Sequence, residues 1–199
     1  MKVSGTVCAI IEIALFTVTA NFMRGYGILN IIDPVAYYWL TFTVLTGIWE
    51  SVYVSDRRTP SLEARKLIKE NRHVWTSNYD FTMVLPWKLS RQFYAEYGAW
   101  ADREYMNLSD DWSKIVEGSH GMICGLFSFI GLFHLLATNA THVYYISISI
   151  SMGSQFMNSV LYMAQYGIQT ENMDSVNYNT SQFPTGRFLS KRPFMWINY

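Results

Sequence analysis

Four stretches of this chain are nearly free of charged side chains, and they constrain its fold more than any other feature. They cover residues 3–23, 35–49, 118–137 and 143–165, and a further apolar run begins at Pro193. A transmembrane helix needs about 20 predominantly apolar residues, which the third and fourth stretches supply outright. The second reaches that length by extending to residue 54, and the first by including Glu12. We therefore predict an all-α transmembrane bundle with four spans and the start of a fifth.

The composition agrees with a membrane protein. Of the 199 residues 50% are hydrophobic and 15% charged, whereas soluble domains have about 25% charged residues. Aromatic residues make up 17%, including seven Trp and fourteen Tyr, as expected where rings meet lipid headgroups. A formal net charge of zero gives a nucleic-acid partner no electrostatic support. Cys8 and Cys124 have no partner spacing, so we predict two free thiols, no metal site and no cofactor.

The basic residues predict the orientation of the bundle. Ten of the fifteen Lys and Arg residues fall within residues 51–115, and Lys2 would lie on the same side of the membrane. The opposite side holds Arg24 alone. Basic loops stay on the cytoplasmic side, so the N-terminus and the 51–115 loop should be cytoplasmic, or on the matrix side in an organelle. We interpret residues 3–23 as a retained span because Glu12 interrupts the apolar run that a secretory signal needs.

The fourth apolar stretch contains "ISISISMGS", residues 146–154, in which apolar and polar residues alternate. This alternation is typical of a strand, but an isolated strand cannot satisfy its backbone hydrogen bonds within lipid, so we predict a helix. On that helix Ser147, Ser151, Ser154 and Asn158 form one polar stripe, with Gln155 beside it. Gly121-x-x-x-Gly125 gives the third span a similar face of small residues. Such faces more often pack helices together than contact a ligand.

The long segment between the second and third spans is polar and rich in aromatic residues, and we expect it to form a loop. Asp33-Pro34 should start the second span, since Asp caps a helix and Pro suits its first position. Thr59-Pro60 can start a short amphipathic, basic helix, either lying on the membrane surface or forming a solvated connector. The later part, residues 79–114, could be an interfacial segment or could pack compactly under the bundle. We find no repeat and no linker, so residues 1–199 form a single domain.

Three carboxylates, Glu12, Glu50 and Glu117, lie in or beside the apolar spans. A charged side chain at the bilayer centre costs at least about 2.5–3.5 kcal/mol, so such groups usually face a partner, a cavity or the bundle interior. Glu50 ends the second span and Glu117 starts the third, at matching depth, so the two could line one cavity as an acidic pair. Alternatively, Glu117 sits in a first helical turn favoured by the helix dipole, and Glu50 reaches the interface. The role of Glu12 stays open.

His120 follows Glu117 by one helical turn, so the carboxylate could orient the imidazole for function. More commonly, this spacing marks a buried Glu–His pair that has only a structural role. The chain has no Gly-rich phosphate loop, no Cys-x-x-Cys and no Gly-x-Ser-x-Gly motif. Common soluble-enzyme chemistries therefore have no support in the sequence.

One segment, "FYAEYGAWADREYMNLSDDWSKIVEGSHGM", resembles a conserved stretch of the EXPERA-domain family, the group of emopamil-binding protein and the sigma-2 receptor. The matching residues are Glu96, Tyr97, Asp102, Arg103, Tyr105, Asp110 and Glu117. "GIWESVYV", which contains Glu50, is similar to that family's second-span end. "GSQFMNSVLYMAQYG" and "RPFMWINY" are similar to its fourth and fifth spans. The resemblance covers roughly residues 38–199.

This resemblance implies a helical bundle around an apolar, sterol-sized cavity. In the sterol isomerase branch, buried carboxylates protonate a ring double bond and aromatic side chains stabilise the carbocation. Glu50 and Glu117 would match that acidic pair. The residues expected to contact the ligand are Trp49, Tyr97, Asp102, Tyr105, His120, Gln155, Asn158 and Tyr162. Thr46 replaces a family His, and Asn198 lies too near the start of the fifth span to be matched; both departures favour binding over Δ8–Δ7 isomerase catalysis.

Three functions stay open at this point. The first is an EXPERA-like protein that binds a membrane lipid or sterol, sterol-isomerase-like and with or without catalysis, in the endoplasmic reticulum. The second is an accessory subunit of a larger membrane complex, for example in an organellar inner membrane, with the 71–112 loop as its docking surface. A small transporter ranks lowest because no broken-helix repeat is visible.

Overall fold

The computed structural model describes all residues except 26–33, 102–115, 117 and 172–199. The described part is built mainly from helices. These are α1 Gly5–Gly25, α2 Pro34–Ser55, α3 Arg58–Glu70, α4 Pro86–Trp100, α5 Ser119–Thr138 and α6 Thr141–Glu171. Two short strands, β1 Lys2–Ser4 and β2 Asn78–Asp80, and the 3-10 helix η1 Phe81–Val84 complete the described elements. The all-α prediction holds apart from this small ribbon.

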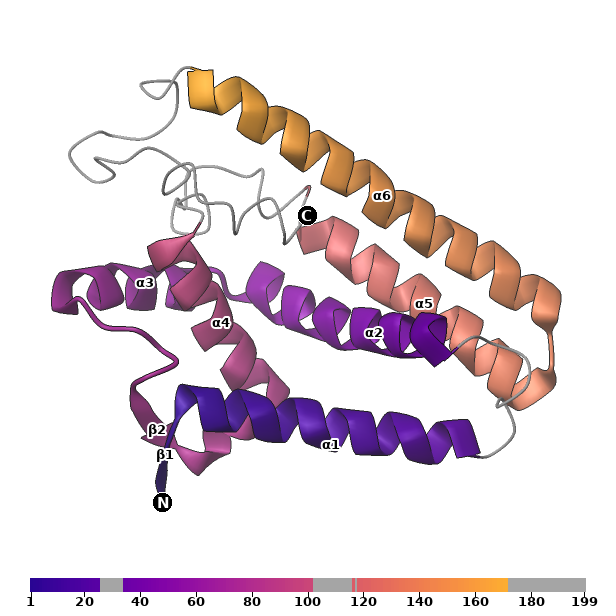
Figure 1. The fold of residues 1–199 in the computed structure, drawn as a ribbon, viewed down its shortest axis with the longest axis horizontal. Helices are drawn as coiled ribbons and strands as arrows, with labels where there is room; N and C mark the ends of the chain where they lie inside the picture. Colours follow the sequence, from indigo (N-terminus) through magenta and orange to yellow (C-terminus); the bar gives the residue numbers. More distant parts are fainter. Residues whose placement is uncertain (26–33, 102–115, 117, 172–199) are drawn as a thin grey trace.

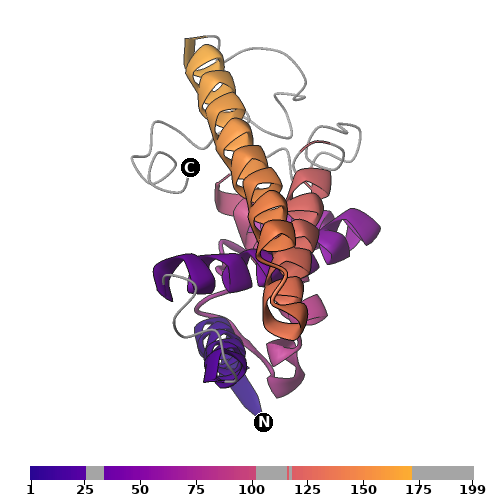
Figure 2. The same ribbon diagram turned by 90° about the vertical axis from the view of Figure 1, so that its right-hand side faces the viewer.

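The four long helices lie beside one another in the order α1, α2, α5, α6, from bottom to top in Figure 1. The most extensive contacts join α2 to α5 and α5 to α6, while α1 touches its neighbours more sparingly. Figure 2, turned by 90°, shows α5 and α6 side by side. The shorter helices α3 and α4 pack on each other near the end that holds the N-terminus. This end also carries Lys2 and the basic residues of α3 and α4; the orientation of the bundle in a membrane stays a prediction.

Two of the described helices, α1 and α5, are long and apolar enough to cross a membrane. Their outward faces leave large apolar side chains uncovered, among them Ile10, Val18, Leu126 and Phe129. Lipid tails would cover these side chains if the helices span a membrane. The predicted spans at α2 and α6 are helical, but only α1 and α5 meet this criterion among the described residues. Four spans remain a prediction, and the start of the fifth lies outside the described residues.

The ribbon of β1 and β2 is a feature that the sequence did not predict. Its strands are antiparallel, with Val3 opposite Tyr79, and three residues are too few to show a reliable alternation. The ribbon continues into the start of α1, where Gly5 donates its N–H to Ser77 O at 3.0 Å. A Cβ at Gly5 would overlap the Val74 carbonyl. The first turn of α1 is thus anchored on the 73–77 loop.

Glycines set the distance between α2 and α5. A Cβ built on Gly125 would lie 2.8 Å from Gly47 Cα and 3.2 Å from Thr43 O. A Cβ on Gly121 would overlap the Glu50 side chain. The predicted close-packing role of Gly121-x-x-x-Gly125 is therefore confirmed, because only residues without side chains allow the two backbones to approach this closely.

The alternating segment "ISISISMGS" lies within α6, so the prediction of a helix is confirmed. Two of its serines, Ser147 and Ser151, face α5, where the Ser151 hydroxyl donates to Cys124 O at 3.0 Å and lies 2.9 Å from Ser128 Oγ. Ser147 packs against Gly131, whose Cβ position is 3.2 Å from the serine Cβ. For Ser147 and Ser151 the packing interpretation of the polar stripe is therefore correct.

The segment between α2 and α5, which we expected to be a loop, contains ordered helices. The apolar face of α3 buries Ala64 and Leu67, and α4 is its main contact. That contact favours a connector helix over one whose apolar face rests on the membrane. Helix α4 starts at Pro86 and packs on both α3 and α2, so this segment packs compactly under the bundle, as one of the two interpretations proposed.

Candidate functional site

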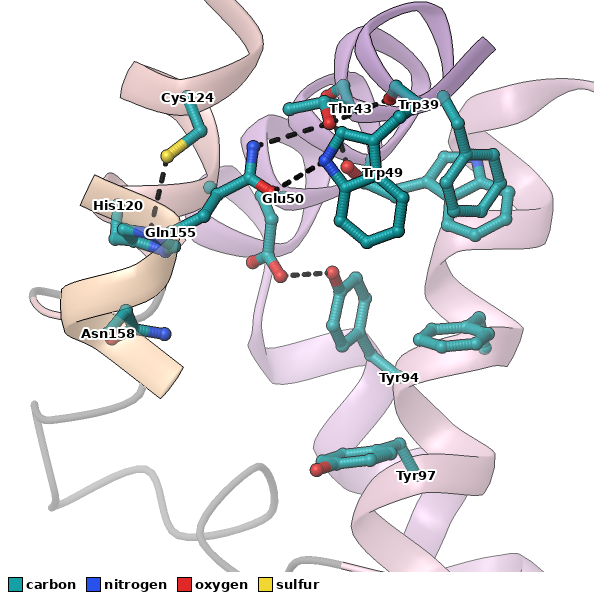
Figure 3. A pocket seen from close by; sticks show the side chains of 14 residues that line it. Trp39, Thr43, Trp49, Glu50, Tyr94, Tyr97, His120, Cys124, Gln155 and Asn158 are labelled. Atoms are coloured by element: carbon teal, nitrogen blue, oxygen red, sulfur yellow. Dashed lines mark hydrogen bonds between the residues drawn. The ribbon is translucent and has the colours of Figure 1, made fainter. Parts of the chain in front are cut away.

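A cavity of about 440 Å³ lies between α2, α4, α5 and α6 (Figure 3). One wall is aromatic and is formed by side chains of α2 and α4; its members are Trp39, Phe42, Trp49, Phe93, Tyr94 and Tyr97. The other wall is more polar and comes from α2, α5 and α6; its members are Thr43, Thr46, Glu50, His120, Gly121, Cys124, Gln155 and Asn158. The volume falls within the roughly 300–1,000 Å³ typical of small-molecule sites.

Glu50 is the carboxyl group of this cavity. It sits near the end of α2, and the Tyr94 hydroxyl from α4 donates a hydrogen bond to its Oε1 (Figure 3). Its second oxygen, Oε2, is buried without a hydrogen-bond partner among the described residues. Gly121 leaves the space that the Glu50 stem occupies against α5. A buried carboxyl group with one free oxygen is suited to bind or protonate a polar atom of a ligand.

The rings of the aromatic wall pack against one another. Trp49 and Phe93 have centroids 5.3 Å apart at an interplanar angle of 35°. Phe93 also stacks on Tyr97 at 6.4 Å and meets Tyr94 edge-on at 5.3 Å. Aromatic faces attract positive charge, and flat rings provide contact area for a rigid apolar ligand. This wall can therefore bind a flat apolar ligand and stabilise a developing cation.

The polar wall is linked by hydrogen bonds across three helices. The Gln155 amide from α6 donates to Thr43 Oγ1 on α2 and to Ser151 Oγ, each at 3.3 Å. Its carbonyl oxygen accepts from Trp39 Nε1 at 3.2 Å. These bonds orient the Gln155 amide and tie α6 to α2 at the cavity, where the two helices otherwise make little contact.

His120 pairs with a thiol in this wall. Its Nε2 lies 3.2 Å from Cys124 Sγ, one turn further along α5. The predicted partner, Glu117, lies outside the described residues, so the orientation of the imidazole by that carboxylate is not described. Within the described residues, no three His, Cys, Asp or Glu side chains come together as a metal ion would require. Cys8 and Cys124 are both free thiols, as predicted.

Glu12, whose role the sequence left open, contacts the cavity wall from behind. Trp49 donates its indole N–H to Glu12 Oε1 at 2.9 Å, and both side chains are buried, with exposed fractions of 5% and 4%. Glu12 Oε2 has no described partner. The sequence indicated that Glu12 needs a partner, because it is an acidic residue inside an apolar helix. It did not indicate which residue that partner is.

Most of the predicted site residues that the structure describes line the cavity. These are Glu50, Trp49, Tyr97, His120, Gln155 and Asn158. The other four predictions fall on Glu117, Asp102 and Tyr105, which lie outside the described residues, and on Tyr162, whose side chain is not described. Other lining residues were missed by sequence reasoning, namely Trp39, Phe42, Phe93, Tyr94 and Cys124. The only sequence signal for the two α4 residues, Phe93 and Tyr94, was the aromatic richness of residues 79–114.

Glu96, which the sequence resemblance singled out, does not line the cavity. Its Oε1 lies 2.7 Å from His73 Nδ1, and its Oε2 accepts the Val74 N–H at 2.8 Å. His73 also stacks on Trp100 with centroids 4.7 Å apart. Both carboxylate oxygens are thus used within the fold, where they hold the loop after α3 against α4.

The fold and site define a helical protein with exposed apolar side chains on its long helices and a half-open cavity in which the carboxyl group of Glu50 lies beside an aromatic wall. Compared with protein-family models, curated proteins and solved structures, the chain matches none of them. Its function must therefore be argued from the cavity itself.

Proposed function

We propose that this chain is an EXPERA-like integral membrane protein that binds a sterol or a lipid of similar size in the cavity beside Glu50. The observation that carries the proposal is the cavity of about 440 Å³ with its aromatic wall and a buried carboxyl oxygen lacking a described partner. An apolar lining with a few fixed polar groups is the usual form of a small-molecule site. A flat apolar molecule with one hydroxyl or a developing positive charge fits this chemistry.

In this proposal all four long helices span the membrane. Helices α1 and α5 have the required length and apolarity. Helices α2 and α6 expose further large apolar side chains, including Val35, Ile48, Phe156 and Val160. Lipid contact would cover these faces, so the cavity would lie where α4 meets the membrane-embedded helices and would be supplied with ligand by the bilayer.

The cavity would bind the sterol or lipid, and isomerase chemistry would be a further activity of the same site. Alkene protonation needs a neutral acid, and burial of a carboxyl group favours its neutral form. Glu50 would supply that acid, and Trp49 with Phe93 would face the resulting cation. Thr46 lines the cavity at the position of the family His and cannot exchange a proton at neutral pH. We therefore propose ligand binding as the function and place catalysis second.

The test is crosslinking of a photoreactive sterol to the purified protein, with competition by unlabelled sterol. Thr46→Phe should abolish saturable labelling because the added ring occupies the cavity. Thr19→Phe is the matched control, since Thr19 is exposed on α1 and also bonds its own helix, to Leu15 O at 2.9 Å. Glu50→Gln should weaken binding ~10-fold if the carboxyl group bonds the ligand.

The outcomes separate the candidate functions. Saturable labelling that is lost in Thr46→Phe and kept in Thr19→Phe supports the binding site. Labelling that Thr46→Phe leaves unchanged refutes it. Absence of sterol binding, together with migration of the chain in a much larger assembly after mild detergent extraction, would favour the accessory-subunit function. Conversion of a Δ8 sterol by the wild type, lost in Glu50→Gln, would add isomerase activity.

A further inference from the structure

Helix α1 contacts the cavity wall through a buried polar pair, Glu12 and Trp49. Glu12 Oε1 accepts the indole N–H of Trp49 at 2.9 Å, and both side chains are at least 95% buried. Apolar contacts of Cys8 and Phe16 with the same core surround this pair. Two further hydrogen bonds join α1 to α2, from the Tyr37 hydroxyl to Ala20 O at 2.8 Å and from the Tyr38 hydroxyl to Asn21 Oδ1. Neither of these two involves a residue that lines the cavity.

The Trp49 ring is held on several sides. Phe93 lies at a centroid distance of 5.3 Å and Phe42 at 6.5 Å, and the Trp49 backbone carbonyl accepts the Ser90 hydroxyl at 2.8 Å. These contacts position the backbone and the ring faces. None of these contacts involves the indole N–H, which Glu12 accepts. A buried indole N–H without an acceptor is unfavourable, so the ring orientation depends on this carboxyl group.

We infer that Glu12 is a positioning residue for the ligand cavity: by accepting the Trp49 N–H it fixes the orientation of that ring and makes α1 a working part of the site. This inference rests on the proposed function for its effect on ligand affinity, but the contact itself can be tested without a ligand. It also accounts for an acidic residue in an otherwise apolar helix, where a carboxylate without a role would only be a cost.

The experiment compares Glu12→Gln, Glu12→Leu and Trp49→Phe, each alone, with the double variant Glu12→Leu/Trp49→Phe. The Gln amide oxygen can still accept the N–H, so Glu12→Gln should bind the photoreactive sterol within ~2-fold of wild type. Glu12→Leu should weaken binding ~10-fold. In the Trp49→Phe background, Glu12→Leu should cause no further loss, because the N–H that it serves is gone.

A second readout follows the ring itself. Protein labelled with 5-fluorotryptophan should show one fluorine resonance that disappears in Trp49→Phe, and this resonance should shift in Glu12→Leu more than in Glu12→Gln. The matched control is Tyr37→Phe, which removes a different α1–α2 hydrogen bond and should leave both the resonance and the affinity unchanged.

Three results would overturn the inference. These are an unshifted Trp49 resonance in Glu12→Leu, independent and multiplicative effects of Glu12→Leu and Trp49→Phe on affinity, and an equal loss of affinity in Tyr37→Phe. Failure of the wild type to bind sterol would refute the proposed function, while the fluorine resonance would still decide whether Glu12 positions Trp49.

Discussion

The close approach of α2 and α5 can be tested by adding one methyl group. In Gly125→Ala the new Cβ would lie 2.8 Å from Gly47 Cα and 3.2 Å from Thr43 O. Non-bonded carbons prefer about 3.5–4.0 Å, so the helices must separate by ~0.7 Å or more. Both contacts are backbone atoms, which cannot move aside as a side chain could. Overpacking of this kind typically costs ~1–3 kcal/mol.

The assay is thermal unfolding of the detergent-purified protein, followed by tryptophan fluorescence. A loss of 2 kcal/mol corresponds to a Tm lower by ~4–8 °C in a chain of this size. Gly153→Ala is the matched control because nothing lies within 4 Å of its Cβ position on α6. It should leave Tm unchanged or raise it, since Ala favours a helix over Gly by ~1 kcal/mol. Equal Tm values for the two variants would refute the close-packing argument.

Two further predictions concern the α5–α6 contact and the membrane orientation. Ser151→Ala removes buried hydrogen bonds between α5 and α6 and should lower the free energy of unfolding by about 1 kcal/mol, or Tm by ~2–4 °C. Ser149 is the control because its hydroxyl bonds Tyr145 O in its own helix, so Ser149→Ala should cost less. Equal losses in the two variants would contradict the interface role of Ser151. Single cysteines at Lys66 and Thr141, each in a chain whose natural cysteines are replaced, should react with a membrane-impermeant thiol reagent from opposite sides of the membrane. Reaction of both from one side would contradict the proposed orientation.

The helices were the predictable part of this fold. Apolar runs of about 20 residues have few alternatives to a helix when no water is present to bond the backbone, which is why the alternation in residues 146–154 did not mislead. Pro34 starts α2 as expected, because proline lacks the N–H that a first helical turn leaves unpaired. The small residues at Gly121, Gly125 and Ser151 pack helices as predicted, since a missing side chain permits a close approach in any bundle.

The cavity was predictable only in part. Glu50 and Gln155 were expected to line it, because polar groups in apolar helices usually face the interior. Tyr94 and Phe93 were missed, since the segment that contains them was expected to be a loop and its helical rotation against α2 was unknown. The contact between Glu12 and Trp49 joins residues 37 positions apart, a separation that hydropathy and local spacing cannot pair.

The sequence alone determined that the long apolar segments are helical and which carboxylates within them had to be accounted for. It could do so because these properties depend on neighbouring residues and on the solvent around each helix. Only the tertiary structure decided that Glu50 enters the cavity with Tyr94 while Glu12 stays behind Trp49. That choice depends on how far each helix rotates and how closely it approaches the next, and here the glycines of α2 and α5 set that distance.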